Sequence, residues 1–175
     1  VPIEHVRAAI TRELGRPPEL AFAAFDPVPL ASASIGQVHA AVLHDGAAVV
    51  VKVRRPGVVE EVERDLEILG GIARWIEVHT AAGRDYEFMP IVDEFARAIH
   101  DELDYRREGQ NADQLRRFFV GDPGVRIPRV IWSHTTESVL TLERVGGIKI
   151  SDLAAIDRAG IPRRAIAENA VRIFL

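Results

Sequence analysis

The chain has 175 residues, a mass of 19.3 kDa and 47% hydrophobic residues, enough to bury the core of one ordinary domain. With 22 Lys+Arg against 26 Asp+Glu, the net charge is −4, so the sequence lacks the basic excess of a general nucleic-acid-binding protein. It contains no cysteine, which excludes a disulfide framework and a thiolate metal site. No apolar run approaches the roughly 18 residues of a membrane span.

The N-terminal stretch is helical in pattern. Apolar residues at helical spacing predict an amphipathic helix over residues 3–14: Ile3, Val6, Ile10 and Leu14. Gly15 and the Pro17-Pro18 pair end this helix, and residues 19–25 predict a second, shorter one. From residue 30 the pattern changes to that of strands.

Two strands joined by a hairpin are expected over residues 37–53. The Asp45-Gly46 pair between them is a strong hairpin signal. The second strand, residues 48–53, is a nearly continuous β-branched run. Such a run is typical of a strand that is covered on both faces.

Two long helices follow, and the first carries one apolar stripe with an expected kink at Gly70-Gly71: Val62, Leu66, Leu69, Ile72 and Ile76. After a loop that contains Gly83, the second is expected as one helix from about residue 90 to 119. Strands are predicted over 127–133 and 138–143, and two further helices over 151–175, with Ser151 as an N-cap. This order predicts an α+β fold, with an antiparallel sheet packed by helices on one side.

Lys52 lies in the most apolar strand of the chain and is one of only two lysines, the other being Lys149. On an exposed strand, a lysine stem that snorkels to solvent would be explanation enough. In a buried strand an unpaired ammonium is unfavourable, so a carboxylate partner or an anionic ligand is expected. We therefore interpret Lys52 as a functional lysine.

The segment ahead of this strand, residues 29–38, is rich in small residues (PLASASIGQV). Small residues let backbone amides approach a ligand closely, as phosphate-cradling loops do. Alone the signal is weak, because Ala-Ser loops are common and no GxGxxG motif is present. Followed by a hairpin and a lysine strand, however, it gives the pattern of the nucleotide-holding half of a protein kinase.

A run of charged residues, 101–108, lies on the second long helix. Alone it is typical of a solvated face, where arginines offset the repulsion between Asp104 and Glu108. On one continuous helix, at about 100° per residue, Glu102 and Glu108 would lie roughly 120° apart around the axis. We therefore expect only one of the two glutamates to reach Lys52.

Together these residues resemble the UbiB family of atypical kinase-like proteins. The resemblance covers nearly the whole chain in collinear order, and its most specific segments are PLASASIGQVH (29–39) and ELDYRREGQN (102–111). The other matching segments are Phe25-Asp26, VVVKVRRP (49–56) and VLTLERVGGIKI (139–150).

The resemblance implies a protein-kinase-like N-terminal lobe in which an alanine-rich loop replaces the glycine-rich loop of ordinary kinases. Carried over to this sequence, the family's site comprises the loop Ala31, Ser32, Ala33 and Ser34, the lysine–glutamate pair Lys52 and Glu108, the ExD motif Glu102 and Asp104, and the hinge residues Glu143 and Val145. The ExD residues are implied in the metal-nucleotide region and in contact with an N-terminal KxGQ motif. The hinge residues would offer backbone groups to adenine. The implied cofactors are ATP or ADP with Mg²⁺, whose ligands are expected mostly outside this chain.

The sequence is expected to be a piece of a longer protein. Residues 1–145 would form the nucleotide-binding lobe, with a helical extension (1–25) and inserted helices (58–119), and residues 146–175 the hinge and an incomplete second lobe. The KxGQ segment would precede Val1. The catalytic-loop Asp and Asn and the DFG-like Asp would follow Leu175.

Three functions stay open at this point. The first is an atypical kinase or ATPase that supports ubiquinone or other isoprenoid-lipid metabolism, and the second a non-catalytic ATP- or ADP-binding regulator or scaffold of lipid-pathway enzymes. The third, an ordinary helical interaction module, leaves Lys52 without a reason. Expected partners are the nucleotide and a lipid or lipid-biosynthesis enzymes, with no nucleic acid. We expect a cytoplasmic location, with membrane association only through segments outside this chain.

Overall fold

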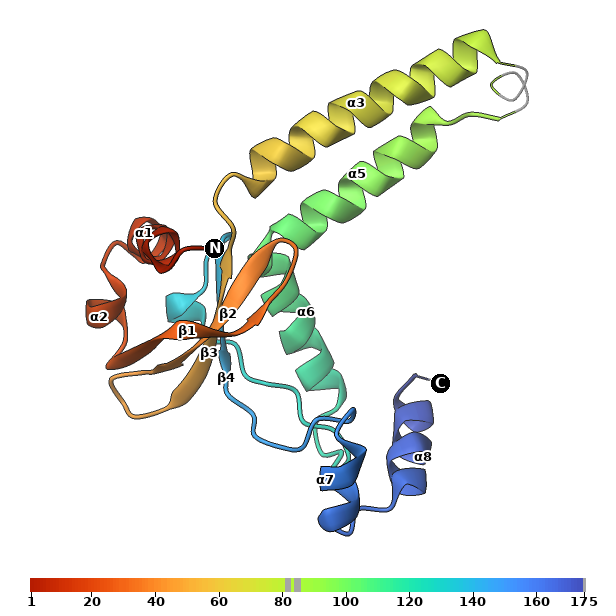
Figure 1. Cartoon of the computed structure of the whole chain (residues 1–175). Helices are drawn as coiled ribbons and strands as arrows, with labels where there is room; N and C mark the ends of the chain where they lie inside the picture. The colour runs from red at the N-terminus through yellow and green to blue at the C-terminus, as the bar shows by residue number, and fades with distance from the viewer. Residues whose placement is uncertain (81–82, 84–85, 175) are drawn as a thin grey trace.

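A four-stranded antiparallel sheet forms the centre of the fold (Figure 1). The computed structural model describes residues 1–80, 83 and 86–174. The strands follow chain order across the sheet: β1 (Ala24–Ser32), β2 (Gly36–Val42), β3 (Ala48–Arg54) and β4 (Val139–Glu143). The predicted hairpin between β2 and β3 is present, with Gly46 at a φ of 87° and the Asp45 carboxylate accepting from the Ala47 N–H.

Helices α1 (Ile3–Leu14) and α2 (Pro18–Ala21) pack on one face of this sheet. Alternate residues of β3 point into that core, and Val49, Val51 and Val53 are almost fully buried. The second predicted helix is shorter than expected, because β1 already begins at Ala24.

The opposite face of the sheet is covered by α6 (Tyr105–Phe118). Its core consists of Tyr105, Val130 and Leu140. The expectation of helices on one side only was therefore wrong, since α1 and α2 cover one face and α6 the other (Figure 1). On this second face Lys52 of β3 is only half-buried, so the strand is less covered there than on the face toward α1 and α2.

Helices α3 (Val58–His79) and α5 (Met89–Leu103) form a long antiparallel pair that projects away from the sheet (Figure 1). Helix α3 is continuous through Gly70 and Gly71, the position of the expected kink. The loop predicted around Gly83 lies partly outside the described residues.

The helix expected over residues 90–119 is two helices, α5 and α6, separated at Asp104. Asp104 takes an extended conformation (φ −92°, ψ 99°), and its carboxylate accepts from the Arg106 N–H at 3.0 Å. An aspartate in this position is an N-cap, which starts a new helix in a new direction. The chain thereby turns from the projecting pair back onto the sheet.

The strand expected over residues 127–133 is reduced to a single bridge between Val130 and Leu142, followed by a 3₁₀ turn, η1 (Trp132–His134). Pro128 has no N–H to continue a ladder along the edge of β4.

Beyond β4 lie α7 (Leu153–Arg158) and α8 (Arg163–Phe174). Asp152 rather than Ser151 caps α7, since its carboxylate accepts from the Ala155 N–H. Within the described ranges, no helix combines the length and apolar character needed to cross a membrane.

Candidate functional site

Lys52 and Glu108 form an ion pair between β3 and α6. The Lys52 ammonium donates to Glu108 Oε2 at 2.6 Å, as the sequence predicted. The Lys52 side chain is 20% exposed and that of Glu108 43% exposed, so the pair opens to solvent on the glutamate side. A lysine ammonium has three N–H donors, so the single bond to Glu108 leaves donors that an anion could accept.

Close packing of α6 against the sheet brings Glu108 within reach of the lysine. The next residue, Gly109, has no side chain, and a Cβ there would lie 2.9 Å from the Trp132 ring and 3.4 Å from the Val130 side chain. At the start of α6, the Tyr105 N–H donates to the Glu137 carbonyl at 3.0 Å. The helix is thus fixed at its N-terminus and held close to the sheet at Gly109.

We expect Gly109→Val to lower the free energy of unfolding by about 1–3 kcal/mol, the usual range for overpacking. The added methyl groups must displace Trp132 or push α6 and Glu108 away from Lys52. Urea unfolding would measure the loss. Gly71→Val is the matched control, because Gly71 also lies within a helix and a Cβ there meets no atom within 4 Å. Equal losses in both variants would show that the close packing at Gly109 is unimportant.

Tyr105 lies beneath the lysine and was not assigned a role from the sequence. Its side chain is fully buried, and the Lys52 ammonium lies over its ring, 4.5 Å from the centroid. Burial, with a smaller contribution from the Glu108 charge, raises the pKa of the Tyr105 hydroxyl, so the phenol stays neutral beside the lysine. The signal in the sequence was the spacing of three residues to Glu108, which places both residues on one side of a helix.

The predicted small-residue loop is a tight turn between β1 and β2. Ala31 and Ser32 belong to the end of β1, while Ala33 and Ser34 lie in the turn, and all four are exposed. The turn is closed by the Ala33 N–H, which donates to the Gly36 carbonyl at 2.8 Å. Gly36 begins β2, beside the lysine strand, and pairs with Arg54.

The two residues of the predicted ExD motif have different surroundings. Glu102, at the end of α5, lines a polar cleft of about 320 Å³ together with Glu108, and the other lining residues are Ala98, Asp101, Arg107, Gln110 and Asn111. Asp104 caps α6 instead. The predicted angle of 120° between Glu102 and Glu108 does not apply, because they lie on different helices. The expectation that only one of them pairs with Lys52 is nevertheless confirmed.

Of the two predicted hinge residues, Glu143 is the last residue of β4 and Val145 lies two residues beyond it. The Glu143 N–H donates to the Arg129 carbonyl at 2.8 Å, and its carboxylate pairs with Arg126 at 2.5 Å, which holds the pKa of Glu143 below its usual value. Val145 is 40% exposed. Among the described residues, the Val145 N–H makes no backbone hydrogen bond, whereas that of Glu143 is already used.

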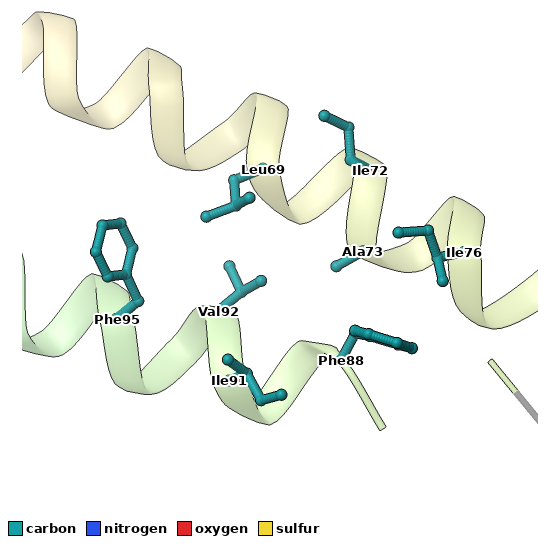
Figure 2. A pocket seen from close by; sticks show the side chains of 8 residues that line it. All are labelled: Leu69, Ile72, Ala73, Ile76, Phe88, Ile91, Val92 and Phe95. Carbon is teal, nitrogen blue, oxygen red and sulfur yellow. The ribbon is translucent and has the colours of Figure 1, made fainter. Parts of the chain in front are cut away.

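An apolar groove lies apart from these residues, between α3 and α5 (Figure 2). It has a volume of about 330 Å³ and is lined by side chains without a titratable group: Leu69, Ile72, Ala73, Ile76, Phe88, Ile91, Val92 and Phe95. Such a lining offers no acid, base or anion contact.

In the part of the chain that the structure describes, no group of three or more His, Asp or Glu residues is arranged to hold a metal ion.

An antiparallel sheet whose third strand carries a lysine paired to a glutamate on the packed helix defines the class of protein, the N-terminal lobe of a kinase-like fold. The profile of the ABC1 atypical kinase-like domain matches residues 1–175. The chain therefore belongs to the ABC1, or UbiB, family of atypical kinase-like proteins, as the sequence motifs predicted.

Relatives with known names support this membership. A probable protein kinase UbiB from Xylella fastidiosa (strain 9a5c) is 48% identical over 170 residues, which cover 96% of this chain and 30% of the relative. A probable protein kinase UbiB from Marinobacter nauticus is 43% identical over 173 residues, 99% of this chain and 32% of the relative. The chain thus spans about 30% of the length of these curated relatives.

A solved structure shares the fold. It is described as "The complex structure of Rv3197-erythromycin from Mycobacterium tuberculosis" and superposes with a TM-score of 0.77 at 28% sequence identity. The match covers 87% of this chain and 38% of that chain.

Proposed function

We propose that this chain supplies the nucleotide-binding lobe of an atypical kinase or ATPase that uses ATP or ADP with Mg²⁺. The observation that carries the proposal is the 2.6 Å pair between Lys52 and Glu108. In kinases a lysine on the third strand contacts the nucleotide phosphates, and a glutamate on the packed helix holds that lysine in place. The family membership supports the same assignment.

The residues around this pair suit the parts of a nucleotide. The exposed turn at Ala33 and Ser34 would lie over the phosphates, and the free N–H of Val145 would donate to adenine. The carboxylates of Asp101 and Glu102 line the polar cleft beside Glu108 and are oxygen ligands of the kind that Mg²⁺ takes together with phosphate oxygens. When bound, Mg²⁺ would neutralise charge on the phosphates.

The proposed biological role is support of ubiquinone or other isoprenoid-lipid metabolism, with a lipid or lipid-biosynthesis enzymes as partners. This role rests on the name UbiB carried by the relatives, each of which is called a probable protein kinase. The alternative, a non-catalytic nucleotide-binding regulator, requires the same site.

The test is calorimetric titration of the full-length protein with ATP and with ADP, in the presence and absence of Mg²⁺, followed by measurement of phosphate release. Saturable binding supports the proposal. Binding without turnover or phosphate transfer would favour the regulator. Absence of binding to either nucleotide would refute both functions.

We expect Ala33→Gly to change nucleotide affinity, or the preference between ATP and ADP, more than it changes folding stability. A glycine can take a positive φ and move its backbone toward the phosphates, which alanine disfavours. The substitution should lower the free energy of unfolding by only about 1 kcal/mol, through the entropy of the unfolded chain. Nucleotide titrations and melting curves of the same samples measure both effects. Unchanged affinities for both nucleotides would leave the turn as a mere connection.

A further inference from the structure

The Tyr105 side chain contacts two parts of the proposed site at once. It belongs to the core on the α6 face of the sheet, where its relative exposure is 0% and where Ile35 and Leu140 pack with it. The N-cap at Asp104 and the bond from the Tyr105 N–H to the Glu137 carbonyl fix its backbone. A buried aromatic ring on a fixed backbone has little freedom to move.

The first contact is with Lys52. The ammonium lies over the ring at 4.5 Å from the centroid while it donates to Glu108 at 2.6 Å. A ring face attracts a cation, most strongly where solvent is partly excluded. The lysine is therefore held from two directions, by an anion on α6 and by a π-face one helical turn before it.

The second contact is with the turn that leads into β2. A Cβ on Gly36 would lie 2.5 Å from the Tyr105 hydroxyl oxygen and 2.6 Å from the Val53 carbonyl oxygen, so the hydroxyl closes directly beneath the Gly36 backbone. The Gly36 carbonyl also accepts the hydrogen bond from the Ala33 N–H that closes the turn. Among the described residues this buried hydroxyl has no hydrogen-bond partner, so it acts here by packing.

We propose that Tyr105 is a positioning residue of the nucleotide site, which couples the Lys52 ammonium to the Ala33–Gly36 turn without itself contacting the nucleotide. This inference rests on the proposed function. It states that a residue outside the lysine–glutamate pair sets the position of the Lys52 ammonium relative to the turn. The ring makes the contact with the ammonium, and the hydroxyl makes the contact with the Gly36 backbone.

The test compares Tyr105→Phe and Tyr105→Leu in the full-length protein by titration with ATP and ADP. The phenylalanine variant keeps the ring under the ammonium and loses the hydroxyl beneath Gly36, so we expect it to bind about threefold more weakly than wild type. The leucine variant should bind about tenfold more weakly. Phe22→Leu is the matched control, because Phe22 is an equally buried ring in the core on the opposite face of the sheet. It should lower the melting temperature and leave nucleotide affinity unchanged.

A second measurement does not depend on the leucine variant folding or on nucleotide binding. In protein labelled with ¹³C at the lysine ε-carbons, the Lys52 signal is assigned by its loss in Lys52→Arg. We expect an upfield ring-current shift of the Lys52 ε-protons in wild type and Tyr105→Phe. A wild-type signal at the position of an unstructured lysine would overturn the contact itself.

The two proposals fail in distinguishable ways. Wild-type protein that binds neither nucleotide would overturn both of them, whatever the lysine signal. If Tyr105→Leu keeps the wild-type nucleotide affinity, only the positioning role is overturned. The same holds if Phe22→Leu loses as much nucleotide affinity as Tyr105→Leu at the same melting temperature. A loss of affinity that is small in Tyr105→Phe, large in Tyr105→Leu and absent in Phe22→Leu, together with the shifted lysine signal, would support it.

Discussion

Replacing Lys52 by methionine should weaken ATP binding by at least about tenfold, because a charge-assisted hydrogen bond contributes about 1.5–3 kcal/mol. Methionine keeps the length and apolar character of the lysine stem, so the packing against Tyr105 is retained while the ammonium is lost. Lys149→Met is the matched control. Lys149 is the second of the two lysines and is exposed beyond the predicted hinge residues Glu143 and Val145. Titration of both variants with ATP measures the difference.

The stability of the Lys52 variant separates two roles of the ion pair. Breaking a fully buried pair costs about 3–5 kcal/mol. Here the Glu108 side chain is 43% exposed, so solvent screens the charge that is left behind, and we expect a loss of about 1 kcal/mol. Melting curves of Lys52→Met and Glu108→Gln would show small, similar shifts. A large loss of stability with normal nucleotide affinity in Lys52→Met would make the pair structural and remove the main support for the proposed function.

The break between α5 and α6 shows where reading the sequence reached its limit. The apolar stripe ends at Leu103, but no glycine or proline lies between residues 91 and 108 to mark the end of a helix, so local signals predict one helix. Asp104 can cap a helix or sit inside one on a solvated face, and tertiary contacts decide between the two. The bond from the Tyr105 N–H to the Glu137 carbonyl lies between residues 32 positions apart, and no local pattern reports it.

The strands were predictable where local signals agreed. The β2–β3 hairpin follows from Asp45-Gly46 and from the β-branched run of β3, and both are in the structure. The run 127–133 has the composition of a strand, but Pro128 lacks an N–H and the chain turns into η1 at Trp132, so only one bridge to β4 forms. A composition rich in β-branched residues does not by itself supply a partner strand.

The lysine–glutamate pair could be predicted because it depends on residue type. A lysine in an apolar strand needs an anion, and the family motif indicated which glutamate supplies it. Tyr105, Gly36 and Gly109 were harder to recognise, since each acts through close packing. Their importance appears only when atoms of α6 are placed against the sheet, where a single added carbon at either glycine lies closer than 3.0 Å to a neighbour.

Gly36→Val should be among the most destabilising single substitutions in this lobe. A Cβ at Gly36 would lie 2.5 Å from the Tyr105 hydroxyl oxygen and 2.6 Å from the Val53 carbonyl oxygen. The carbonyl belongs to the backbone of β3, and the tyrosine is fully buried, so neither atom can move aside easily. We expect a loss of about 3 kcal/mol in the free energy of unfolding, the upper part of the range for overpacking.

Urea unfolding of Gly36→Val beside Ala33→Val tests this expectation, because the control adds similar bulk in the same turn at an exposed position. Ala33→Val should change the free energy of unfolding by no more than about 0.5 kcal/mol, as surface substitutions usually do. Gly36→Val should also lose nucleotide affinity, because either β2 must move away from β3 or Tyr105 must leave its place under Lys52. Equal stabilities of the two variants would mean that the turn yields to added volume, and that β2 does not depend on the close contact with Tyr105.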